Sequence, residues 1–317
     1  MASELPSLPA RDPDGHKGTF GTVAVIGGCD RDGLMMLGAP LLAGRGALRA
    51  GVGLCRFCLP SSILAPALAA LPAATGFAFQ GRAPTRLPPS DAVVIGPGLG
   101  PAGEQSRAVF DLLKQLDRPA VIDADGLNAL ASGLRASRKL PDLSRCVLTP
   151  HPAEYARLAQ ACRLREDPID PRARESAACA MADRLRTTVV LKGARTVVSN
   201  GSSIWVCSRG HACMATSGTG DVLAGVLGAL LAQNEAAGWG MPLFDVARVA
   251  VDAHARAGEA WAEAHGASAG VLVEELADLI PNALRPLSSG GSRATQAVEA
   301  SPNQRAESGS YRPALRR

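Results

Sequence analysis

Aromatic residues are scarce in this chain: Phe, Trp and Tyr make up only 3% of its 317 residues. Proteins that bind single-stranded nucleic acid stack the bases on exposed aromatic rings, so this scarcity argues against that role. An excess of charge of one sign is also lacking, because the formal net charge is only +4 and several basic residues lie near the C-terminus. The sequence therefore predicts no nucleic-acid partner.

Long hydrophobic runs are missing too. No stretch approaches the roughly eighteen apolar residues that a helix needs to span a bilayer, and residues 1–15 lack the apolar core of a signal peptide. The eight cysteines are scattered through apolar segments, as expected for reduced thiols in the cytoplasm. We therefore expect a cytoplasmic protein with no membrane partner, in which residues 1–15 form a mobile leader.

One pair of cysteines, Cys55 and Cys58, has the CxxC spacing of zinc ligands. A zinc site needs further ligands, which a lone CxxC does not supply. Both cysteines lie in LCRFCL, a segment with the composition of a β-strand, so we expect them to be buried in the core.

The sequence does contain enough apolar residues, 47% of the total, for a large core. Apolar strands alternate with helical segments, which predicts an α/β fold with a mostly parallel central sheet and helices on both faces. The Asn200-Gly201 dipeptide lies between two β-rich runs and predicts an antiparallel hairpin at the sheet edge. The expected strands lie within 16–28, 54–59, 91–100, 119–130, 146–158 and 187–193, and the expected helices cover 38–50, 62–71, 103–116, 171–186, 216–230, 245–265 and 271–284.

Composition also suggests where the domain ends. Residues 287–317 are polar and rich in glycine and serine, so we expect a disordered tail after a single domain that covers residues 16–286. Within that domain the unusual loops all follow strands. In a sheet of this kind such loops meet beyond the carboxyl ends of the strands, where we expect the ligand site.

The most informative segment is TSGTGDVLAGVLGALL, which contains the sequence Gly218-Thr219-Gly220-Asp221 just before an apolar helical pattern. Glycine lets the backbone turn tightly and approach a ligand. The unpaired N–H groups at the start of the helix make an anion site, typically for phosphate. A carboxylate beside bound phosphate suits a proton acceptor, although Asp221 also fits a simple helix cap.

Five stretches together resemble the ADP/ATP-dependent (S)-NAD(P)H-hydrate dehydratase family, a branch of the ribokinase-like superfamily: HKGTFGTVAVIGG, VVIGPGLG, VIDADGLN, LTPHPAEYARL, and LKGARTVV with MATSGTGDVLAG. The resemblance runs from about residue 16 to residue 284. It implies a ribokinase-like fold and a stand-alone dehydratase that restores NADH or NADPH from the hydrated forms NADHX and NADPHX. It also implies ADP or ATP as co-substrate, Mg²⁺ as cofactor, transfer of a phosphoryl group to the hydroxyl on carbon 6 of the nicotinamide ring, and a homotetramer.

The resemblance assigns roles to individual residues. Asp221 would be the catalytic base and a contact of the hydrated cofactor, and Gly218, Thr219 and Gly220 would form the anion hole. The remaining assignments are nucleotide binding by Lys192, Gly193, Ala194, Arg195, Thr196 and Gly220; binding of the hydrated cofactor by Ala39, Gly100 and His151; and contact with magnesium through water by Glu154.

Alternative interpretations apply to several of these residues. Lys192 also fits a solvated strand end, and His151 also fits a capped helix start after proline. Asp123, Asp125 and Asn128 follow a strand and face the expected crevice, but loop capping explains them equally well. His16, Lys17 and Gly18 match the family's entry motif without an evident role, whereas His211, His254 and His265 suit structural or exposed positions.

The sequence departs from the family pattern at Cys29, where many members have serine, and along residues 30–37. Both departures concern the part that would hold the hydrated cofactor. Two rival functions remain open. A small-molecule kinase of the same superfamily, such as a thiazole or pyrimidine kinase, would share the GTGD sequence, and a nucleotide-binding regulatory protein would lack catalysis.

Overall fold

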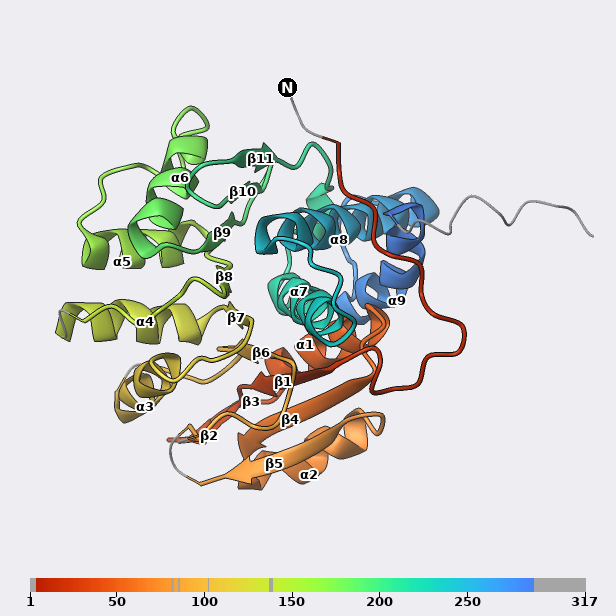
Figure 1. Cartoon of the computed structure of the whole chain (residues 1–317), viewed down its shortest axis with the longest axis horizontal. Helices are drawn as coiled ribbons and strands as arrows, with labels where there is room; N and C mark the ends of the chain where they lie inside the picture. Colours follow the sequence, from red (N-terminus) through yellow and green to blue (C-terminus); the bar gives the residue numbers. More distant parts are fainter. Residues whose placement is uncertain (1–3, 81–82, 85, 102, 137–138, 288–317) are drawn as a thin grey trace, which may run out of the picture.

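The computed structural model describes residues 4–80, 83–84, 86–101, 103–136 and 139–287. These residues form a nine-stranded sheet, in which every neighbouring pair from β9 to β5 is parallel, and β10 and β11 add an antiparallel edge (Figure 1). Across the sheet the strands are β11 (Ile204–Val206), β10 (Val197–Ser199), β9 (Thr188–Leu191), β8 (Cys146–Leu148), β7 (Ala120–Ile122), β6 (Ala92–Ile95), β1 (Thr22–Ile26), β4 (Leu54–Pro60) and β5 (Thr75–Phe79). The expected ribokinase-like fold, with its edge hairpin, is confirmed.

Helices cover both faces of the sheet, because side chains alternate along each strand between two buried clusters. In β1, Val23 and Val25 belong to one cluster, whereas Ala24 and Ile26 belong to the other. The first cluster packs against α1 (Gly38–Arg49), α2 (Ser61–Ala70), α7 (Thr219–Ala236), α8 (Leu243–His265) and α9 (Val273–Leu284). The second packs against α3 (Glu104–Leu113), α4 (Asp125–Ala136), α5 (Pro152–Cys162) and α6 (Arg174–Leu185).

Helix α7 is apolar around most of its surface, and the structure places it between the sheet and the other helices of its layer (Figure 1). Glycines allow this burial. A Cβ atom at Gly225 would overlap the carbonyl oxygen of Ala43 in α1, and one at Gly228 would overlap the Val94 side chain in the sheet. The same close approach is seen from α1, where a Cβ at Gly46 would lie 2.5 Å from the carbonyl oxygen of Val222 in α7. Backbone contact therefore fixes α7 against its neighbours.

The direction of strand addition reverses at β1. The chain proceeds from β1 to β4 and β5 on one side, and then returns to β6, β7, β8 and β9 on the other. The loops after β1 and β6 therefore lead to helices on opposite faces of the sheet. In such sheets ligands bind beyond the carboxyl ends of the strands, next to this reversal. The motif loops converge there, in the region that we call the crevice.

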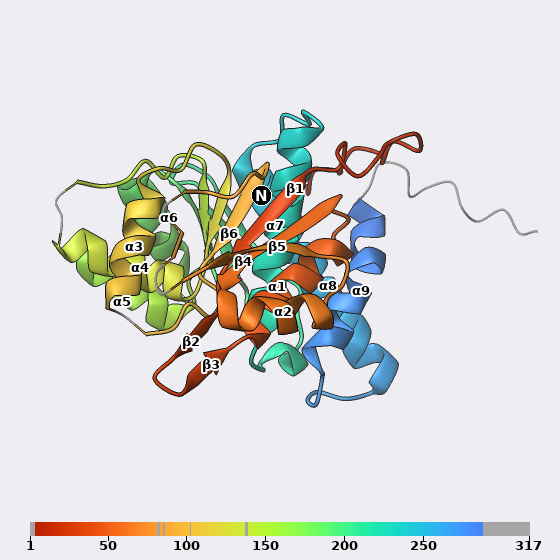
Figure 2. The same cartoon turned by 90° about the horizontal axis from the view of Figure 1, so that it is seen from below.

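Two elements were not expected from the sequence. One is strand β5, and the other is a hairpin of β2 (Cys29–Arg31) and β3 (Leu34–Met36), which projects from the molecule in Figure 2. Its turn residues Asp32 and Gly33 both have positive φ, 53° and 78°. Asp-Gly is a favoured sequence for such a turn, so a signal was present, but the strands are too short to show alternation.

Residues 4–15 contact the domain, whereas the sequence predicts a mobile leader over residues 1–15. Leu8 is buried, and its N–H donates to the carbonyl of Leu287 at 2.6 Å. Arg11 stacks 3.4 Å from the centre of the Phe20 ring and donates to the carbonyl of Gly51. Leu287 closes the short 3₁₀ helix η2 (Arg285–Leu287), and the rest of the expected tail, 288–317, lies outside the described residues.

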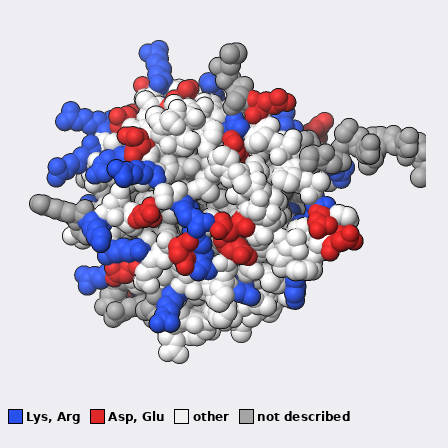
Figure 3. All heavy atoms as spheres, in the orientation of Figure 1, with Lys and Arg blue, Asp and Glu red and all other residues white. Residues whose placement is uncertain are grey.

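The CxxC cysteines are buried on opposite faces of β4, Cys55 in one cluster and Cys58 in the other. They therefore cannot bind one metal ion together, and burial raises the pKa of each thiol to about 12. On the face drawn in Figure 3, acidic and basic side chains are interspersed. Within the described residues no helix combines the length and hydrophobicity of a transmembrane span.

Candidate active site

Three neighbouring strands end in side chains that meet. Asp123 follows β7, Thr149 follows β8 and Lys192 follows β9. The Lys192 ammonium donates to Asp123 Oδ1 at 2.6 Å, and the Thr149 hydroxyl donates to the same oxygen at 2.7 Å. Glu154 Oε2 lies 3.8 Å from the Lys192 nitrogen. Asp123 is 1% exposed, so this ion pair holds a buried carboxylate at the edge of the sheet.

The N-terminus of α7 approaches this group from the opposite layer. Gly218, the N-cap, has φ of 95°, a conformation that favours glycine. The Lys192 ammonium lies 3.3 Å from the position that a Cβ of Gly220 would occupy. The first turn of α7, with its unpaired N–H groups, and the Lys192 charge therefore face the same space, which suits an anion.

Asp221, in the first turn of α7, completes the group that we call the carboxylate cluster: Asp123, Asp125, Glu154 and Asp221 around Lys192. Burial, and then the negative charge of Asp123, raise the pKa of Asp221 to about 7. Burial also raises the pKa of Glu154 to about 7, although Lys192 opposes the shift. Burial alone would lower the pKa of Lys192, but Asp123 and Glu154 outweigh it and raise that pKa. The cluster has more carboxylates than cations, so a positive partner would stabilise it.

His151 and Glu154 form a capping box at the start of α5. The His151 N–H donates to Glu154 Oε2 at 2.8 Å, and Nδ1 of His151 accepts from Ala153 N at 3.1 Å. A neutral ring that accepts at Nδ1 carries its proton on Nε2, which lies 3.3 Å from Glu154 Oε1. Capping thus explains the geometry of His151, while its ring stays half exposed beside the cluster.

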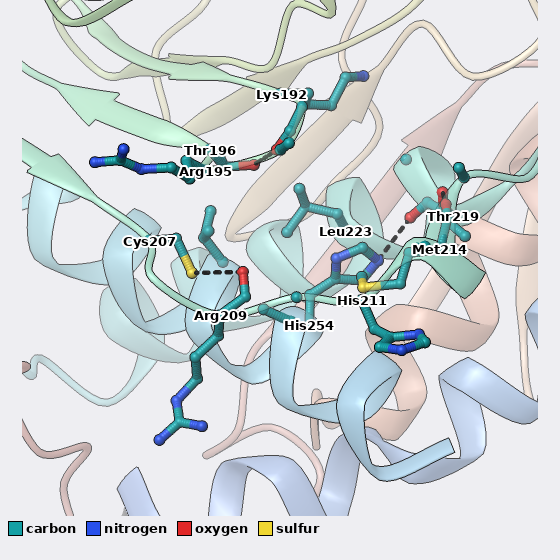
Figure 4. Close-up of a pocket in the computed structure, with 18 of the residues that line it drawn as sticks. Lys192, Arg195, Thr196, Cys207, Arg209, His211, Met214, Thr219, Leu223 and His254 are labelled. Atoms are coloured by element: carbon teal, nitrogen blue, oxygen red, sulfur yellow. Dashed lines mark hydrogen bonds between the residues drawn. The ribbon is translucent and has the colours of Figure 1, made fainter. Parts of the chain in front are cut away.

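A cavity of about 550 Å³ opens beside the cluster (Figure 4). All six residues of the expected nucleotide set line it: Lys192, Gly193, Ala194, Arg195, Thr196 and Gly220. The opposite wall comes from residues 207–215 and from α7 and α8. Lys192 lies at its upper rim in Figure 4, and Leu223 and Val251 add apolar surface to its lining. A lining that is charged at one rim and has apolar surface elsewhere matches a ligand with phosphates at one end and a flat ring at the other.

The lining also includes residues that sequence reasoning did not place there, among them His254 and His211, which were expected to be structural or exposed, and Arg209 and Met214. His254 is buried, its Nε2 lies 2.9 Å from the carbonyl oxygen of Thr219, and burial lowers its pKa to about 4. It therefore holds the first turn of α7 as a neutral ring. No sequence signal links a histidine in α8 to the GTGD segment, because only the packing of α7 on α8 brings them together. His265 instead stacks on Trp261.

The remaining expected residues, Ala39 and Gly100, lie on the other side of the cluster. The Gly100 N–H donates to Asp125 Oδ2 at 2.9 Å, and Asn128 donates to Oδ1 of the same carboxylate at 3.1 Å. A Cβ at Gly98 would lie 3.3 Å from the Ala39 Cβ, and one at Gly100 would lie 2.7 Å from the Cys29 sulfur. Asp125 therefore does cap a loop, and that loop is the one with Gly100.

The crevice thus has two sides. The cavity side comprises residues 192–196, residues 207–215 and the start of α7, and the glycine side comprises residues 27–39 and 96–100. The carboxylate cluster lies between them. Gly218, Thr219, Gly220 and Asp221 contribute to the cluster region, whereas Ala39 and Gly100 do not line the cavity.

The donor set fits a magnesium ion only in an indirect role. Among the described residues, no three His, Cys, Asp or Glu side chains are arranged to bind a metal directly. The cluster nevertheless has more carboxylates than cations, and burial, together with the negative charge of Asp123, raises the pKa of Glu154 to about 7. Magnesium retains several of its waters and binds through few carboxylates together with phosphates, so these residues fit it through water.

Comparison with known proteins agrees with this arrangement. A family model described as NAD(P)H-hydrate dehydratase matches residues 23–282. An ADP-dependent (S)-NAD(P)H-hydrate dehydratase from Neisseria meningitidis is 35% identical over 279 residues, which cover 84% of this chain and 86% of that protein. A Bacillus subtilis protein of the same name is 33% identical over 281 residues, with 87% and 93% covered.

A bifunctional NAD(P)H-hydrate repair enzyme from Thermofilum pendens is 35% identical, and the chain spans about half, 53%, of its length. Among solved structures, the Bacillus subtilis ADP/ATP-dependent NAD(P)H-hydrate dehydratase, co-crystallised with ATP/Mg²⁺, superposes with a TM-score of 0.71 at 29% identity and covers 90% of this chain and 100% of its own. The matches extend over all the strands of the sheet that end at the carboxylate cluster. This chain therefore belongs to the NAD(P)H-hydrate dehydratase family of hydro-lyase enzymes.

Proposed function

We propose that the protein dehydrates (S)-NADHX and (S)-NADPHX with ADP as co-substrate, and so restores NADH and NADPH. The main support for this proposal is the position of Asp221. This carboxylate lies in the first turn of α7, beside Lys192 and the cavity, and burial raises its pKa to about 7. A base whose pKa lies near neutrality accepts a proton from a hydroxyl most effectively at physiological pH.

In the proposed first step, Asp221 takes the proton of the hydroxyl on carbon 6 of the substrate ring. The hydroxyl oxygen then bonds to the terminal phosphorus of ADP, and the bond from that phosphorus to the bridging oxygen breaks, which leaves AMP. Gly218, Thr219 and Gly220 offer backbone N–H groups to the transferring group, and Lys192 offers positive charge. Elimination of phosphate from carbon 6, with loss of a proton from the adjacent ring carbon, restores the double bond.

The two sides of the crevice divide the ligands. Residues Lys192 to Thr196 and Gly220 line the cavity and would hold the adenine nucleotide. Ala39, Gly100 and His151 would hold the hydrated cofactor on the opposite side of the cluster, where the loops after β1 and β6 meet. Glu154 would contact Mg²⁺ through water, and the ion would neutralise phosphate charge during transfer.

The assay that tests this function follows absorbance near 340 nm, the band of reduced nicotinamide, after hydrated NADH is mixed with the protein and ADP or ATP. A dehydratase produces that absorbance together with one phosphate for each nucleotide cleaved. A kinase of the same superfamily would consume the nucleotide and accumulate a phosphorylated product without absorbance. A regulatory protein would bind the nucleotide and cleave none, so the three outcomes are distinct.

We also propose that the enzyme works in the cytoplasm as a homotetramer. The eight cysteines are free thiols, seven of them buried, which is compatible with a reducing compartment. Sedimentation at several protein concentrations tests the assembly. A single species with the mass of one chain, 32.5 kDa, would exclude a tetramer.

A further inference from the structure

The half-buried side chain of Arg174, on α6, contacts the strand end that leads to the cavity without lining the cavity itself. Its Nη2 donates to the carbonyls of Leu191 at 3.0 Å and Lys192 at 3.1 Å, and its Nη1 donates to the carbonyl of Pro168 at 2.7 Å. The third nitrogen, Nε, is buried without a hydrogen-bond partner. The Arg174 side chain thus donates to three backbone carbonyls, while its Nε–H remains without an acceptor.

The contact with Lys192 fixes the orientation of a peptide group. No described peptide bond is cis, and a trans peptide is planar, so the N–H of Gly193 points opposite to the carbonyl of Lys192. Gly193 lines the cavity and Arg174 does not. Because Arg174 holds the carbonyl on the side away from the cavity, the N–H of Gly193 faces the cavity. Within the described residues, that N–H has no acceptor.

The fit between the two residues requires glycine. Gly193 has φ of 138°, and a Cβ there would lie 3.2 Å from Arg174 Nη2. A side chain at this position would therefore press on the guanidinium as well as strain the backbone. The Lys192 ammonium and the start of α7 adjoin the same rim, so the free N–H of Gly193 adds a donor to a region that already suits an anion.

We propose that Arg174 is a positioning residue for nucleotide binding: it holds the Lys192 carbonyl so that the Gly193 N–H points into the cavity and donates to a phosphate oxygen of the nucleotide. This inference rests on the proposed function only for the identity of the ligand. It concerns a residue that never touches the ligand, and it explains why an arginine in α6 contacts the end of β9.

Selective isotope labelling isolates the Gly193 amide. The sequence has four lysines, and only two precede glycine, in Lys17-Gly18 and Lys192-Gly193. Protein with ¹³C-carbonyl lysine and ¹⁵N-glycine, deuterated elsewhere, therefore gives two carbonyl-correlated amide signals. The Gly18 N–H already donates to His16 Nδ1 at 3.0 Å, so its signal serves as an internal reference. ADP should shift the Gly193 proton downfield and leave Gly18 unchanged, and adenosine, which has no phosphate, should not produce that shift.

The variant Arg174→Met keeps an unbranched apolar stem and removes all the donors of the side chain. The ADP-induced shift of Gly193 should then be lost, and KM for ADP should rise roughly 10- to 100-fold, the effect of one lost hydrogen bond to a charged group. KM for hydrated NADH should stay within about twofold, since the glycine side is unchanged. Arg174→Lys, which retains a charged donor, should recover part of both losses. Arg184→Met, an exposed arginine of the same helix, is the matched control and should behave as the parent.

The inference is overturned if ADP binds by calorimetry without moving the Gly193 signal, or if the shift is equally large in the parent and in a folded Arg174→Met. Equal loss of affinity for both ligands would also overturn it, because it would indicate general damage. Turnover of hydrated NADH tests the proposed function separately. A protein that binds ADP through Gly193 and yet produces no NADH would refute that function and retain the role of Arg174.

Discussion

On the cavity side of the crevice, charge and directed hydrogen bonds determine the structure: Lys192 pairs with Asp123, and Arg174 holds the carbonyls before Gly193. On the glycine side, backbone contact does so. The loop after β6 packs on the loop after β1 so closely that a Cβ at Gly27 would overlap the carbonyl of Pro97, and Gly28 N donates to that same carbonyl at 3.0 Å. We therefore expect the cavity side to be the more sensitive to changes of charge and the glycine side to be the more sensitive to changes of shape.

The largest expected effect lies between the two sides. Asp221→Asn keeps the size and the capping ability of the side chain, so the fold and the nucleotide affinity should survive. The amide accepts no proton, and kcat should fall by about 10²–10⁴-fold with much smaller changes in both KM values. Initial rates of NADH formation measure this. A variant with near-parental turnover would reduce Asp221 to a helix cap and would exclude the proposed mechanism.

The pH dependence follows from the same carboxylate, whose pKa burial raises to about 7. Because the base must be ionised, kcat should fall about tenfold per pH unit below 7. The raised pKa also means that ionisation opposes folding. This cost is absent below the unfolded value of about 4, grows as pH rises, and is complete above 7. The melting temperature of Asp221→Asn should therefore exceed that of the parent at pH 8 and equal it near pH 3.5. A difference of the opposite sign would contradict the raised pKa.

Lys192→Met tests whether charge determines the cavity side. The substitution keeps the stem but leaves Asp123 buried without its cation, which costs about 3–5 kcal/mol of folding free energy. ADP should bind roughly 10- to 100-fold more weakly, since the lost partner is a charged donor, and hydrated NADH should bind nearly as before. Denaturant titration gives the folding free energy, and separate calorimetric titrations give the affinities for ADP and for hydrated NADH. Equal weakening of both ligands would erase the distinction between the sides.

Gly100→Ala tests whether shape determines the glycine side. The new Cβ would lie 2.7 Å from the Cys29 sulfur, at a residue with φ of 84°. Gly33→Ala is the matched control, because its φ is 78° and no atom lies within 4 Å of the added Cβ. We expect Gly100→Ala to cost about 1–3 kcal/mol more than Gly33→Ala in denaturant unfolding. It should also raise KM for hydrated NADH and leave the affinity for ADP unchanged. An equal loss of unfolding free energy in the two variants would show that the loops after β1 and β6 can shift to accept the added Cβ.

The smallest effect is expected outside the crevice. A chain that ends at Leu287 should keep its turnover and melting temperature, because residues 288–317 have the composition of a disordered tail and follow every motif. Differential scanning calorimetry and the NADH assay check this. A melting temperature lower by many degrees would show that these residues pack on the domain.

Sequence reasoning located the parts of this site that are contiguous. Asp221 and Lys192 were identified because each follows a recognisable strand or glycine signal in its own segment. His254 and Arg174 could not be found in this way, since their roles arise only where α8 meets α7 and where α6 meets β9. The β2–β3 hairpin shows the limit for short elements: Asp32-Gly33 predicts a turn, but three-residue strands carry no periodicity. The contacts of residues 4–15 were not predicted, because a single buried side chain, Leu8, cannot be recognised in a segment rich in proline.

The glycine contacts of α7 have a consequence for how the enzyme changes shape. The helix that carries Asp221 packs closely between α1 and the sheet at Gly225 and Gly228, so we expect it to move little relative to them. Any closure around the two ligands should therefore come from the loops, whereas the Asp221 carboxylate keeps its position. Natural variation should then be concentrated in loops such as residues 27–39, and the helix surface should tolerate almost no enlargement along its length. Folding therefore sets the orientation of the Asp221 carboxylate, and the conformational changes that follow ligand binding should take place in the loops of the crevice.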